Sequence, residues 1–482
     1  MEPQRTTRAP RWRSKSPVAL RRTRFPLVAA LTWLAAGCPA TGKEIRPPDD
    51  QFYFPTGMDI APDESVLFVA NANSDLRYDS GAAEIVDLKR IDDMIEVWLT
   101  TQEPPAGLDC QQDLSVPYTL VCDEREAIVH DGTVRMGNFA TELRVQKLDD
   151  TGRLRLFAAV RGDPSLTWID YDVASRTLSC SSTEGFAECD DEHRLSQIRN
   201  DESLPALPDE PFGVFVNSTT GYVVVTHLSN AAISLASAPT DGDTPRLDDA
   251  VGNLFGFGDD GQRGAVGVAG RQPTSDNDRV YVTSRKDARV QTLVVQRGAE
   301  GLQLVPTEYF FMRGTISPSS DGRGIAFSAD GNRAYIINRA PPMLHIFDTS
   351  MNAVGVPKNE FFSGVEICSQ ASNLVVYNPV SAGDEGTDDP DLRPRIFVTC
   401  FGTGQVWSID PTGAVVDRII DVGRGPQSLV VSPLRRKLYV SNNLENTVAV
   451  VDLAPGPTEN RVVLRLGRPR SSSSGTSGDD VQ

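Results

Sequence analysis

Cysteine is the residue type in this sequence whose number and spacing predict chemistry most directly. Seven cysteines occur, and Cys38 stands apart near the N-terminus. An even number of remaining cysteines in an exported chain predicts disulfides. The simplest pairing joins sequence neighbours, and the sequence leaves other pairings open. The predicted pairs are Cys110 with Cys122, Cys180 with Cys189, and Cys368 with Cys400.

A metal site is not predicted from the cysteines or the histidines. No Cys-x-x-Cys spacing occurs, and the four histidines, at 130, 193, 227 and 345, fall in different parts of the chain, whereas zinc ligands usually come at short spacings. The best calcium candidate is the loop GDEGTDDPDL, with carboxylates at 384, 385, 388, 389 and 391. It lacks the Asp-x-Asp-x-Asp-Gly order of a known calcium loop, so a solvated acidic insertion is the favoured interpretation. We expect no cofactor, with calcium as the only candidate ion.

Catalytic signatures are missing from the sequence. It contains no G-x-S-x-G, H-E-x-x-H or G-x-x-x-x-G-K-[ST] pattern. Aspartates recur after predicted third strands, and a ring of carboxylates could bind a cation or catalyse. However, Asp at a strand end usually accepts hydrogen bonds from backbone N–H groups two residues on and starts a turn. We therefore predict turn roles for Asp87, Asp170, Asp348, Asp410 and Asp452, and assign no catalytic, cofactor-binding or metal-binding residue.

The first 37 residues have the layout of a secretory signal. Basic residues between Arg11 and Arg24 precede the apolar FPLVAALTWLAAG. This run of about 13 residues is shorter than the roughly 20 that a membrane-spanning helix needs. The ending LAAGC resembles the lipobox of bacterial lipoproteins, which implies a lipid on Cys38 and a place in the cell envelope. Pro39 rather than Asp follows the Cys, which favours the outer membrane. The alternative is ordinary signal cleavage with a free or disulfide-bonded Cys38.

The net charge of the chain limits the classes of molecule that are expected to bind it directly. The whole sequence has a net charge of -18, and loss of the first 37 residues, which carry eight Lys or Arg and one Glu, leaves it near -25. Nucleic acids and anionic membranes attract basic surfaces, so neither is an expected direct partner. We expect a monomer that touches the membrane through its lipid only, with an unknown envelope protein or extracellular ligand as its partner.

Repeated short strands organise the rest of the chain. Residues 38–51 are rich in Pro and charge and predict a tether, and the Ser- and Gly-rich residues 468–482 predict a disordered tail. The best copy of the repeat is GRGPQSLVVSPLRRKLYVSNNLENTVAVVDL, from Gly423 to Leu453. Its layout is Pro-x-Gly or a degraded form, then three strands separated by turns. Eight candidate units, the weakest near residue 105, have second strands at Phe68, Leu120, Phe157, Val224, Tyr281, Tyr335, Phe397 and Tyr439.

These units predict an all-β propeller over residues 52–467. Their strands are nearly continuous apolar runs such as VAVV at 448–451, and such strands need cover on both faces. Radial packing of four-stranded blades supplies that cover, and ring closure protects the strand edges. No stretch holds a helical apolar period, and 39 Gly and 33 Pro interrupt the chain. The number of blades, seven or eight, stays open.

LYVSNNLENTVAVVDL, at Leu438–Leu453, resembles the YVTN-type repeats of β-propellers, which are related to NHL and quinoprotein-like repeats. Members of that family are mostly secreted or surface-bound bacterial and archaeal proteins. The resemblance implies the fold more strongly than an activity.

The sequence thus predicts an exported, lipid-anchored propeller that acts as a binding or scaffold module. The alternative is a propeller enzyme, lactonase-like or quinoprotein-like, with its site at the central channel. A pocket lined by His227, His345 and acidic residues of the Pro-x-Gly loops would favour a hydrolase, whereas small apolar side chains would favour a scaffold. Irregular insertions at 180–210, 238–263 and 381–394 are the predicted places for a specific function.

Overall fold

The structure, a computed structural model, describes residues 45–183, 187–196, 205–255, 264–271, 278–299, 301–312, 320–379 and 393–468. These described residues belong to one compact unit. Several predictions lie outside the described residues: the signal, Cys38 with most of the tether, the tail after Arg468, and the acidic loop at 384–391. In the described part of the chain, no helix is long and apolar enough to cross a membrane.

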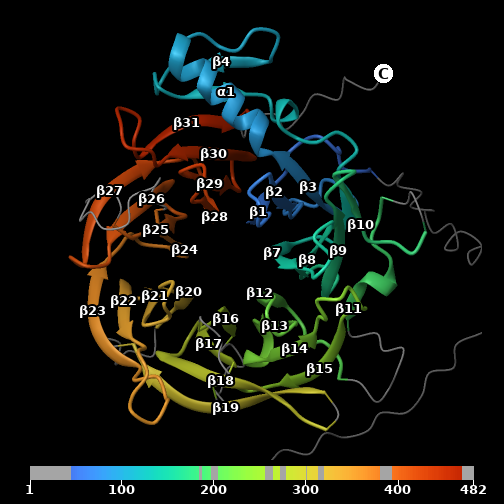
Figure 1. The fold of residues 1–482 in the computed structure, drawn as a ribbon, viewed down its shortest axis with the longest axis vertical. Coiled ribbons are helices and arrows are strands. Elements are labelled where there is room, and N and C mark those ends of the chain that lie inside the picture. Colours follow the sequence, from blue (N-terminus) through green and yellow to red (C-terminus); the bar gives the residue numbers. More distant parts are fainter. Residues whose placement is uncertain are drawn as a thin grey trace, which may run out of the picture. The chain divides into compact units, whose positions relative to one another are not determined.

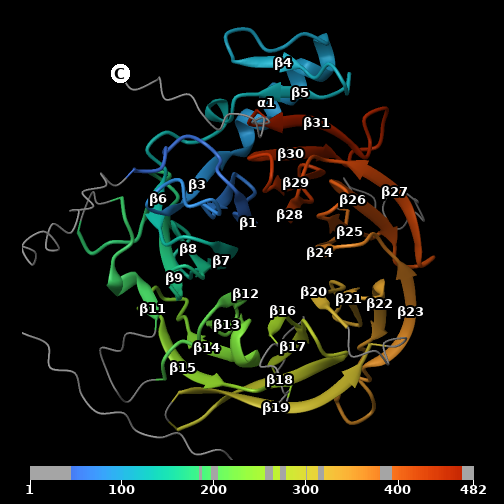
Figure 2. The same cartoon turned by 180° about the vertical axis from the view of Figure 1, so that it is seen from behind.

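Seven antiparallel sheets are arranged around a central axis and form a seven-bladed β-propeller (Figures 1 and 2). Within each blade, consecutive strands pair from the axis outward.

The blades contain the following strands. Blade 1 has β1 (Pro55–Ile60), β2 (Val66–Asn71), β3 (Gly81–Asp87) and β6 (Val134–Met136). Blade 2 has β7 (Ala140–Lys147), β8 (Arg153–Val160), β9 (Ser165–Asp172) and β10 (Thr177–Ser179), with β11 (Arg194–Ser196) also paired to β9. Blade 3 has β12 (Pro211–Asn217), β13 (Tyr222–His227), β14 (Ile233–Ser237) and β15 (Arg246–Val251). Blade 4 has β16 (Ala265–Gly270), β17 (Asp278–Ser284), β18 (Arg289–Arg297) and β19 (Leu302–Phe311).

Blade 5 has β20 (Gly322–Phe327), β21 (Arg333–Arg339), β22 (Pro342–Asp348) and β23 (Glu360–Glu366). Blade 6 has β24 (Ala371–Tyr377), β25 (Arg395–Cys400), β26 (Gln405–Asp410) and β27 (Val415–Asp421). Blade 7 has β28 (Pro426–Ser432), β29 (Lys437–Asn442), β30 (Thr447–Asp452) and β31 (Arg461–Leu466).

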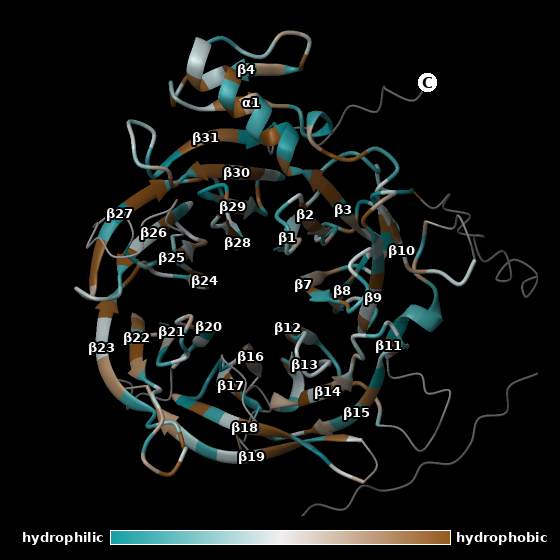
Figure 3. Ribbon diagram, viewed as in Figure 1, coloured by the Kyte–Doolittle hydropathy of each residue, from teal (hydrophilic) through white to brown (hydrophobic). Residues whose placement is uncertain are grey.

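Apolar packing between neighbouring blades forms the core. All residues of β2, β13 and β30 are buried, and Figure 3 shows the apolar character of β30. Burial of consecutive residues requires cover on both faces of a strand, which adjacent blades provide. The fold that the apolar runs predict is confirmed.

Close approach of adjacent first strands explains the recurring Pro-x-Gly. A Cβ on Gly213 would lie 2.4 Å from the Val266 carbonyl oxygen, and one on Gly267 would lie 2.1 Å from that of Arg323. Thr226 fixes the first of these contacts, because its hydroxyl accepts from the Gly213 N–H at 2.9 Å and donates to the Val266 carbonyl at 2.7 Å. The glycines therefore leave room for the next blade.

The structure decides the number of blades, which the sequence left open at seven or eight. The unit near Leu120 is not a blade: β4 (Cys110–Gln112) and β5 (Leu120–Cys122) form a hairpin on the outer edge of blade 7. β5 pairs in parallel with β31, and β4 pairs with β5. The two strands add to the outer edge of an existing blade instead of forming a sheet of their own, although the apolar Leu120–Cys122 resembles the second strand of a repeat.

The structure also contains a helix, which the sequence analysis did not predict. α1 (Leu88–Thr101) buries Leu88, Ile91, Met94, Ile95 and Trp98 along one face. This is the 3.6-residue period of an amphipathic helix, hidden in the sequence because it starts directly where β3 ends. Asp87 is therefore a helix N-cap rather than the start of a turn into a fourth strand, and its carboxylate accepts from the backbone N–H groups of Lys89 and Arg90.

The other recurrent aspartates divide into two groups. The predicted turn role is confirmed for Asp348, Asp410 and Asp452, which each accept from the backbone N–H two residues on, at 2.8–3.2 Å. For Asp170 the prediction is wrong. It lies inside β9 and binds the buried Arg155, with Nε 2.8 Å from its carboxylate.

Three disulfides are present, Cys110–Cys122, Cys180–Cys189 and Cys368–Cys400. They confirm the pairing of sequence neighbours. Several disulfides in one chain are typical of exported proteins, because the cytosol keeps thiols reduced.

Candidate functional site

An axial cavity of about 610 Å³ opens where the first strands end and turn into the second strands. All seven blades contribute to its wall. The lining residues include Asp59 and Ile60 of blade 1, Arg144 and Val145 of blade 2, Phe215 of blade 3, Val268 of blade 4, Ile325 and Phe327 of blade 5, Leu374 of blade 6 and Leu429 of blade 7.

The wall of this cavity is charged on one side only. Asp59 and Arg144 project from the adjacent strands β1 and β7. Blades 3, 4 and 7 contribute aliphatic and aromatic side chains and glycine. The cavity can therefore contact a polar group at blades 1 and 2 and an apolar group across the axis.

Arg144 lies between two carboxylates. Its guanidinium forms an ion pair with Glu142 of the same strand. The other Glu142 carboxylate oxygen accepts from the Val214 N–H of blade 3 at 2.8 Å. Asp59 accepts from the backbone N–H groups of Val145 at 2.8 Å and Ile60 at 2.9 Å. These contacts join blades 1, 2 and 3 at the cavity.

Burial raises the pKa of both carboxyl groups. For Asp59, burial outweighs the opposing effects of Arg144 and of the two backbone N–H groups on the pKa. For Glu142, burial outweighs the effects of Arg144 and of the Val214 N–H on the pKa. A carboxylate with a raised pKa is a better proton acceptor than a solvated one, and such groups are common at functional sites.

Deviations from the repeat produce this site. Glu142 occupies the third position of its first strand, where blades 1, 3, 4 and 5 have glycine. Asp59 and Arg144 occupy the fifth position, where the remaining blades have Phe, Ala or Val. The sequence analysis missed these three residues because it looked for residues that recur. Comparison of equivalent positions for charged exceptions would have found them.

The histidines lie outside this cavity. His227 on β13 is fully buried, with Nε2 2.8 Å from the Ser234 hydroxyl, and burial lowers its pKa to about 4. His345 on β22 is also fully buried, and burial lowers its pKa to about 4. The pocket of His227, His345 and acidic residues that would favour a hydrolase is therefore not formed. Among the described residues, the carboxylate that lines the axial cavity is Asp59, and Glu142 lies on β7 as the partner of Arg144.

Among the residues that the structure describes, no group of three or more His, Cys, Asp or Glu side chains is arranged to hold a metal ion. His193 instead pairs with Asp190, with Nδ1 2.7 Å from the carboxylate. His130 is exposed on the 88–133 insertion.

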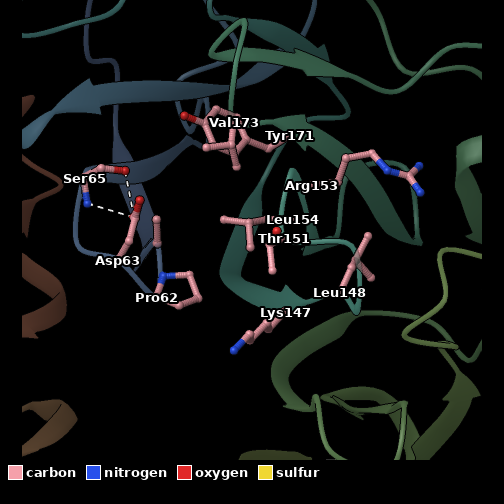
Figure 4. A pocket seen from close by; sticks show the side chains of 11 residues that line it. Pro62, Asp63, Ser65, Lys147, Leu148, Thr151, Arg153, Leu154, Tyr171 and Val173 are labelled. Carbon is pink, nitrogen blue, oxygen red and sulfur yellow. Dashed lines mark hydrogen bonds between the residues drawn. The ribbon is translucent and has the colours of Figure 1, made fainter.

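A smaller cavity of about 260 Å³ lies between blades 1 and 2. Figure 4 shows Pro62 and Asp63 of the β1–β2 turn on one side and Leu154 and Thr151 on the other. Asp63 binds its own turn, because it accepts from the backbone and hydroxyl of Ser65. This cavity is mainly apolar and lacks converging polar groups, so the axial cavity is the stronger candidate.

Part of the 238–263 insertion also lines a cavity. Pro239, Thr240, Asp241 and Asp243 border a polar space of about 530 Å³ at the turns of blades 3 and 4. This space lies on the same face of the ring as the axial cavity, since both are bordered by turns that join first to second strands. The insertion therefore shapes the face that carries the axial site.

Comparison with known proteins supports the fold. The periplasmic gluconolactonase of Pseudomonas aeruginosa is 14% identical with a TM-score of 0.50, over 78% of this chain and 87% of that one. A 6-phosphogluconolactonase-like protein of Bacteroides fragilis is 14% identical with a TM-score of 0.52, over 84% of this chain and 99% of that one. No model of a protein family and no curated protein sequence matches the chain. Identity at this level shows a shared β-propeller fold and not a shared activity.

Proposed function

We propose that this protein is an exported binding module that takes a small amphipathic organic ligand in the axial cavity. The observation that carries the proposal is a cavity of about 610 Å³ with Asp59 and Arg144 on one side and apolar side chains across the axis. Ligand pockets usually have volumes of roughly 300–1,000 Å³ and place a few polar groups in an apolar wall.

The polar side of the cavity limits the ligand chemistry. In the cavity wall Arg144 donates hydrogen bonds and Asp59 accepts them, and the Arg144 guanidinium is already paired with Glu142. A ligand with hydroxyl or amine donors matches this surface, whereas a strongly anionic ligand would meet the Asp59 carboxyl group and an arginine that already has an anionic partner. The apolar part of the ligand would lie against residues such as Phe215 and Leu374.

We propose that a lipid on Cys38 holds the propeller in the cell envelope, with the outer membrane as the favoured site. The arrangement of basic residues, apolar run and LAAGC supports this proposal, as do the three disulfides of the folded part. Replacement Cys38→Ala should abolish incorporation of a labelled fatty acid and release the protein from the membrane fraction. Retention of label in the variant would contradict the anchor.

Binding is tested by native mass spectrometry and a thermal-shift screen with a library of small organic molecules. We expect retained or stabilising compounds with the wild type and their loss with Ala329→Trp, which places an indole at the cavity rim. Val354→Trp is the matched control, because Val354 is 81% exposed and does not line the cavity. Equal binding by both variants would place the ligand elsewhere.

Lactone hydrolysis is a second candidate, favoured by the raised pKa of Asp59 beside Arg144. In this reaction Asp59 would take a proton from water while the water oxygen attacks the lactone carbonyl carbon. The ring C–O bond would break, the leaving oxygen would take up the proton, and a hydroxy acid would form. Arg144 would stabilise the negative charge that develops on the carbonyl oxygen. The gluconolactonase named above suggests glucono-δ-lactone as the first substrate to assay.

The two candidates give different results in one assay. A hydrolase should open glucono-δ-lactone faster than the spontaneous reaction, and Asp59→Asn should reduce this rate by roughly 100-fold or more. The exposed Asp150→Asn is a suitable control. The binding module would be supported if the wild type does not hydrolyse the lactone and if a compound raises the melting temperature of the wild type but not that of Ala329→Trp.

A further inference from the structure

The contact between blades 1 and 7, which we call the seam, differs from the other contacts between neighbouring blades. Other neighbouring blades follow one another along the chain, whereas blades 1 and 7 contain the first and last strands of the ring, β1 and β31. The strands β4 and β5, which lie in the chain between β3 and β6 of blade 1, join the sheet of blade 7. The insertion at residues 88–133, which we call the latch, crosses this seam. Figures 1 and 2 both show α1 and β4 outside β31. Ring closure therefore depends on the latch and on packing at the seam.

The latch is attached to blade 7 by backbone and side-chain contacts. β5 adds to β31 with Leu120 opposite Leu464, and the Thr119 hydroxyl donates to the Val462 carbonyl at 2.7 Å. On the inner side of the latch, the Trp98 indole N–H donates to the Tyr118 carbonyl at 2.9 Å. The helix and the hairpin are thus tied together and to the last blade.

Glu84 is buried in this seam. Its exposed fraction is 0%. Glu84 lies on the same face of β3 as Val86, two residues further on, and Val86 packs in one cluster with Val448 and Leu464 of blade 7. Among the residues that the structure describes, neither carboxylate oxygen has a hydrogen-bond donor within ordinary geometry. Buried carboxylates normally bind a cation or several N–H groups, so Glu84 is an exception that needs an explanation.

The charges around Glu84 are anionic. Glu124 of the latch, in η1 (Glu124–Glu126), and Asp49 and Asp50 of the segment before β1 all raise its pKa, after burial, which is the largest cause. Hydrogen bonding from the Asn71 side chain acts in the opposite direction and lowers the Glu84 pKa. The Asn71 amide nitrogen is close to the carboxyl group but has no acceptor at ordinary hydrogen-bonding geometry in the described part of the chain.

Other polar groups near the site do not compensate for the charge. The Tyr53 hydroxyl, whose pKa Glu84 raises, is also without a partner. Arg135 of β6 lies near Tyr53 and is paired with Asp79 and Glu188. Blade 7 contributes apolar side chains to the adjoining cluster, such as Val448 and Leu466. The site therefore favours the neutral form of the carboxyl group.

We propose that Glu84 is protonated in the closed ring and that its ionisation loosens the latch from blade 7, so that closure of the seam depends on pH. An unpaired buried carboxylate is strongly disfavoured, and the neighbouring carboxylates repel it further. Because the folded state holds this proton more tightly than the unfolded state, the stability from the site is present at low pH. It is lost as pH rises through the folded-state pKa.

The test compares the wild type with Glu84→Gln, which keeps the shape and stays neutral. We expect the melting temperatures to agree near pH 5 and to separate toward pH 9, with the variant higher by roughly 2 °C or more. Glu103→Gln, an exposed acid of the latch, should follow the wild type at every pH. Parallel curves for wild type and Glu84→Gln would overturn the proposal.

Hydrogen exchange provides a second measurement that does not depend on the variant. Between pH 5 and 8, the amide protection of the wild type at the paired residues 120–122 and 464–466 should fall by about tenfold relative to a reference pair of strands. The reference is residues 396–398 and 407–409 of blade 6, and the comparison with it corrects for the change of intrinsic exchange rate with pH. A constant ratio would overturn the proposal. So would stabilisation by 5 mM calcium of the wild type but not of Glu84→Gln, because a bound cation would then neutralise Glu84.

Discussion

Glu142 and Glu84 are glutamates buried at two places in the same ring, and their surroundings are opposite. Glu142 binds the Arg144 guanidinium and the Val214 N–H. Glu84 has no charged or backbone N–H donor among the described residues, only the Asn71 side chain near it, and three carboxylates raise its pKa. Burial raises the pKa of both groups. The comparison indicates that burial alone does not decide what a carboxyl group does: Glu142 holds the Arg144 guanidinium that lines the axial cavity, whereas Glu84 is the group that we propose responds to pH at the seam.

The largest expected effect comes from removal of the guanidinium. Arg144→Ala should destabilise the protein by about 2–3 kcal/mol at pH 7, because it leaves Glu142 and Asp59 without a cation. The loss should shrink toward pH 5 as these carboxyls take up protons. Urea denaturation at both pH values measures it. The control is Lys89→Ala, which breaks the pair with Asp93 in which both side chains are exposed and should change stability by less than about 1 kcal/mol.

The second prediction compares the two glutamates directly. Glu142→Leu should destabilise the protein by about 2 kcal/mol at pH 8, because the Val214 N–H and Arg144 lose an acceptor. Glu84→Leu should change stability little at pH 8 or increase it, since it removes a group that binds no donor. Denaturation curves of both variants measure the difference. Equal losses would mean that Glu84 has a favourable partner at that pH.

A buried base should show the reverse dependence on pH. Burial lowers the pKa of His345 to about 4, so the unfolded state binds more protons between pH 6.5 and 4, and stability falls as pH falls through this window. The wild type should therefore be less stable at pH 5.5 than at pH 7.5, and His345→Phe should remove about 1 kcal/mol of this difference in the free energy of unfolding. The gap between wild-type and variant melting temperatures at pH 5.5 and 7.5 measures this effect. A gap independent of pH would show that His345 is not the responsible group.

The smallest expected effect concerns a neighbour of Glu84. Asp50 raises the pKa of Glu84, so Asp50→Asn should move the pH midpoint of the Glu84 effect downward by a few tenths of a unit. The midpoint is obtained from the difference between the melting temperatures of the parent protein and its Glu84→Gln variant, plotted against pH. This difference is measured once with Asp50 and once with Asp50→Asn in both proteins. An upward movement would contradict the arrangement of charges described for the seam.

Repetition made most of this fold predictable, and exceptions to repetition made the site hard to predict. Strands with apolar runs and Pro-x-Gly starts indicated blades because every blade meets the same packing requirement. The α1 helix and the β4–β5 hairpin were misread, since one begins directly after a strand and the other imitates a strand pair. Glu142 breaks the glycine pattern of its neighbours, yet nothing in its local sequence shows that it lies beside Arg144 and Val214 at the axis.

The sequence by itself determined the all-β propeller and the turn roles of three recurrent aspartates, and it made the neighbour pairing of six cysteines the simplest of the possible pairings. These features depend on local patterns: apolar period, short separations between cysteines, and side-chain contacts within two residues. Tertiary structure decided the number of blades, the placement of the latch on blade 7 and the identity of the charged groups at the axis. Those features depend on contacts between residues far apart in the chain, such as Thr119 with Val462, which exist only once the ring is closed.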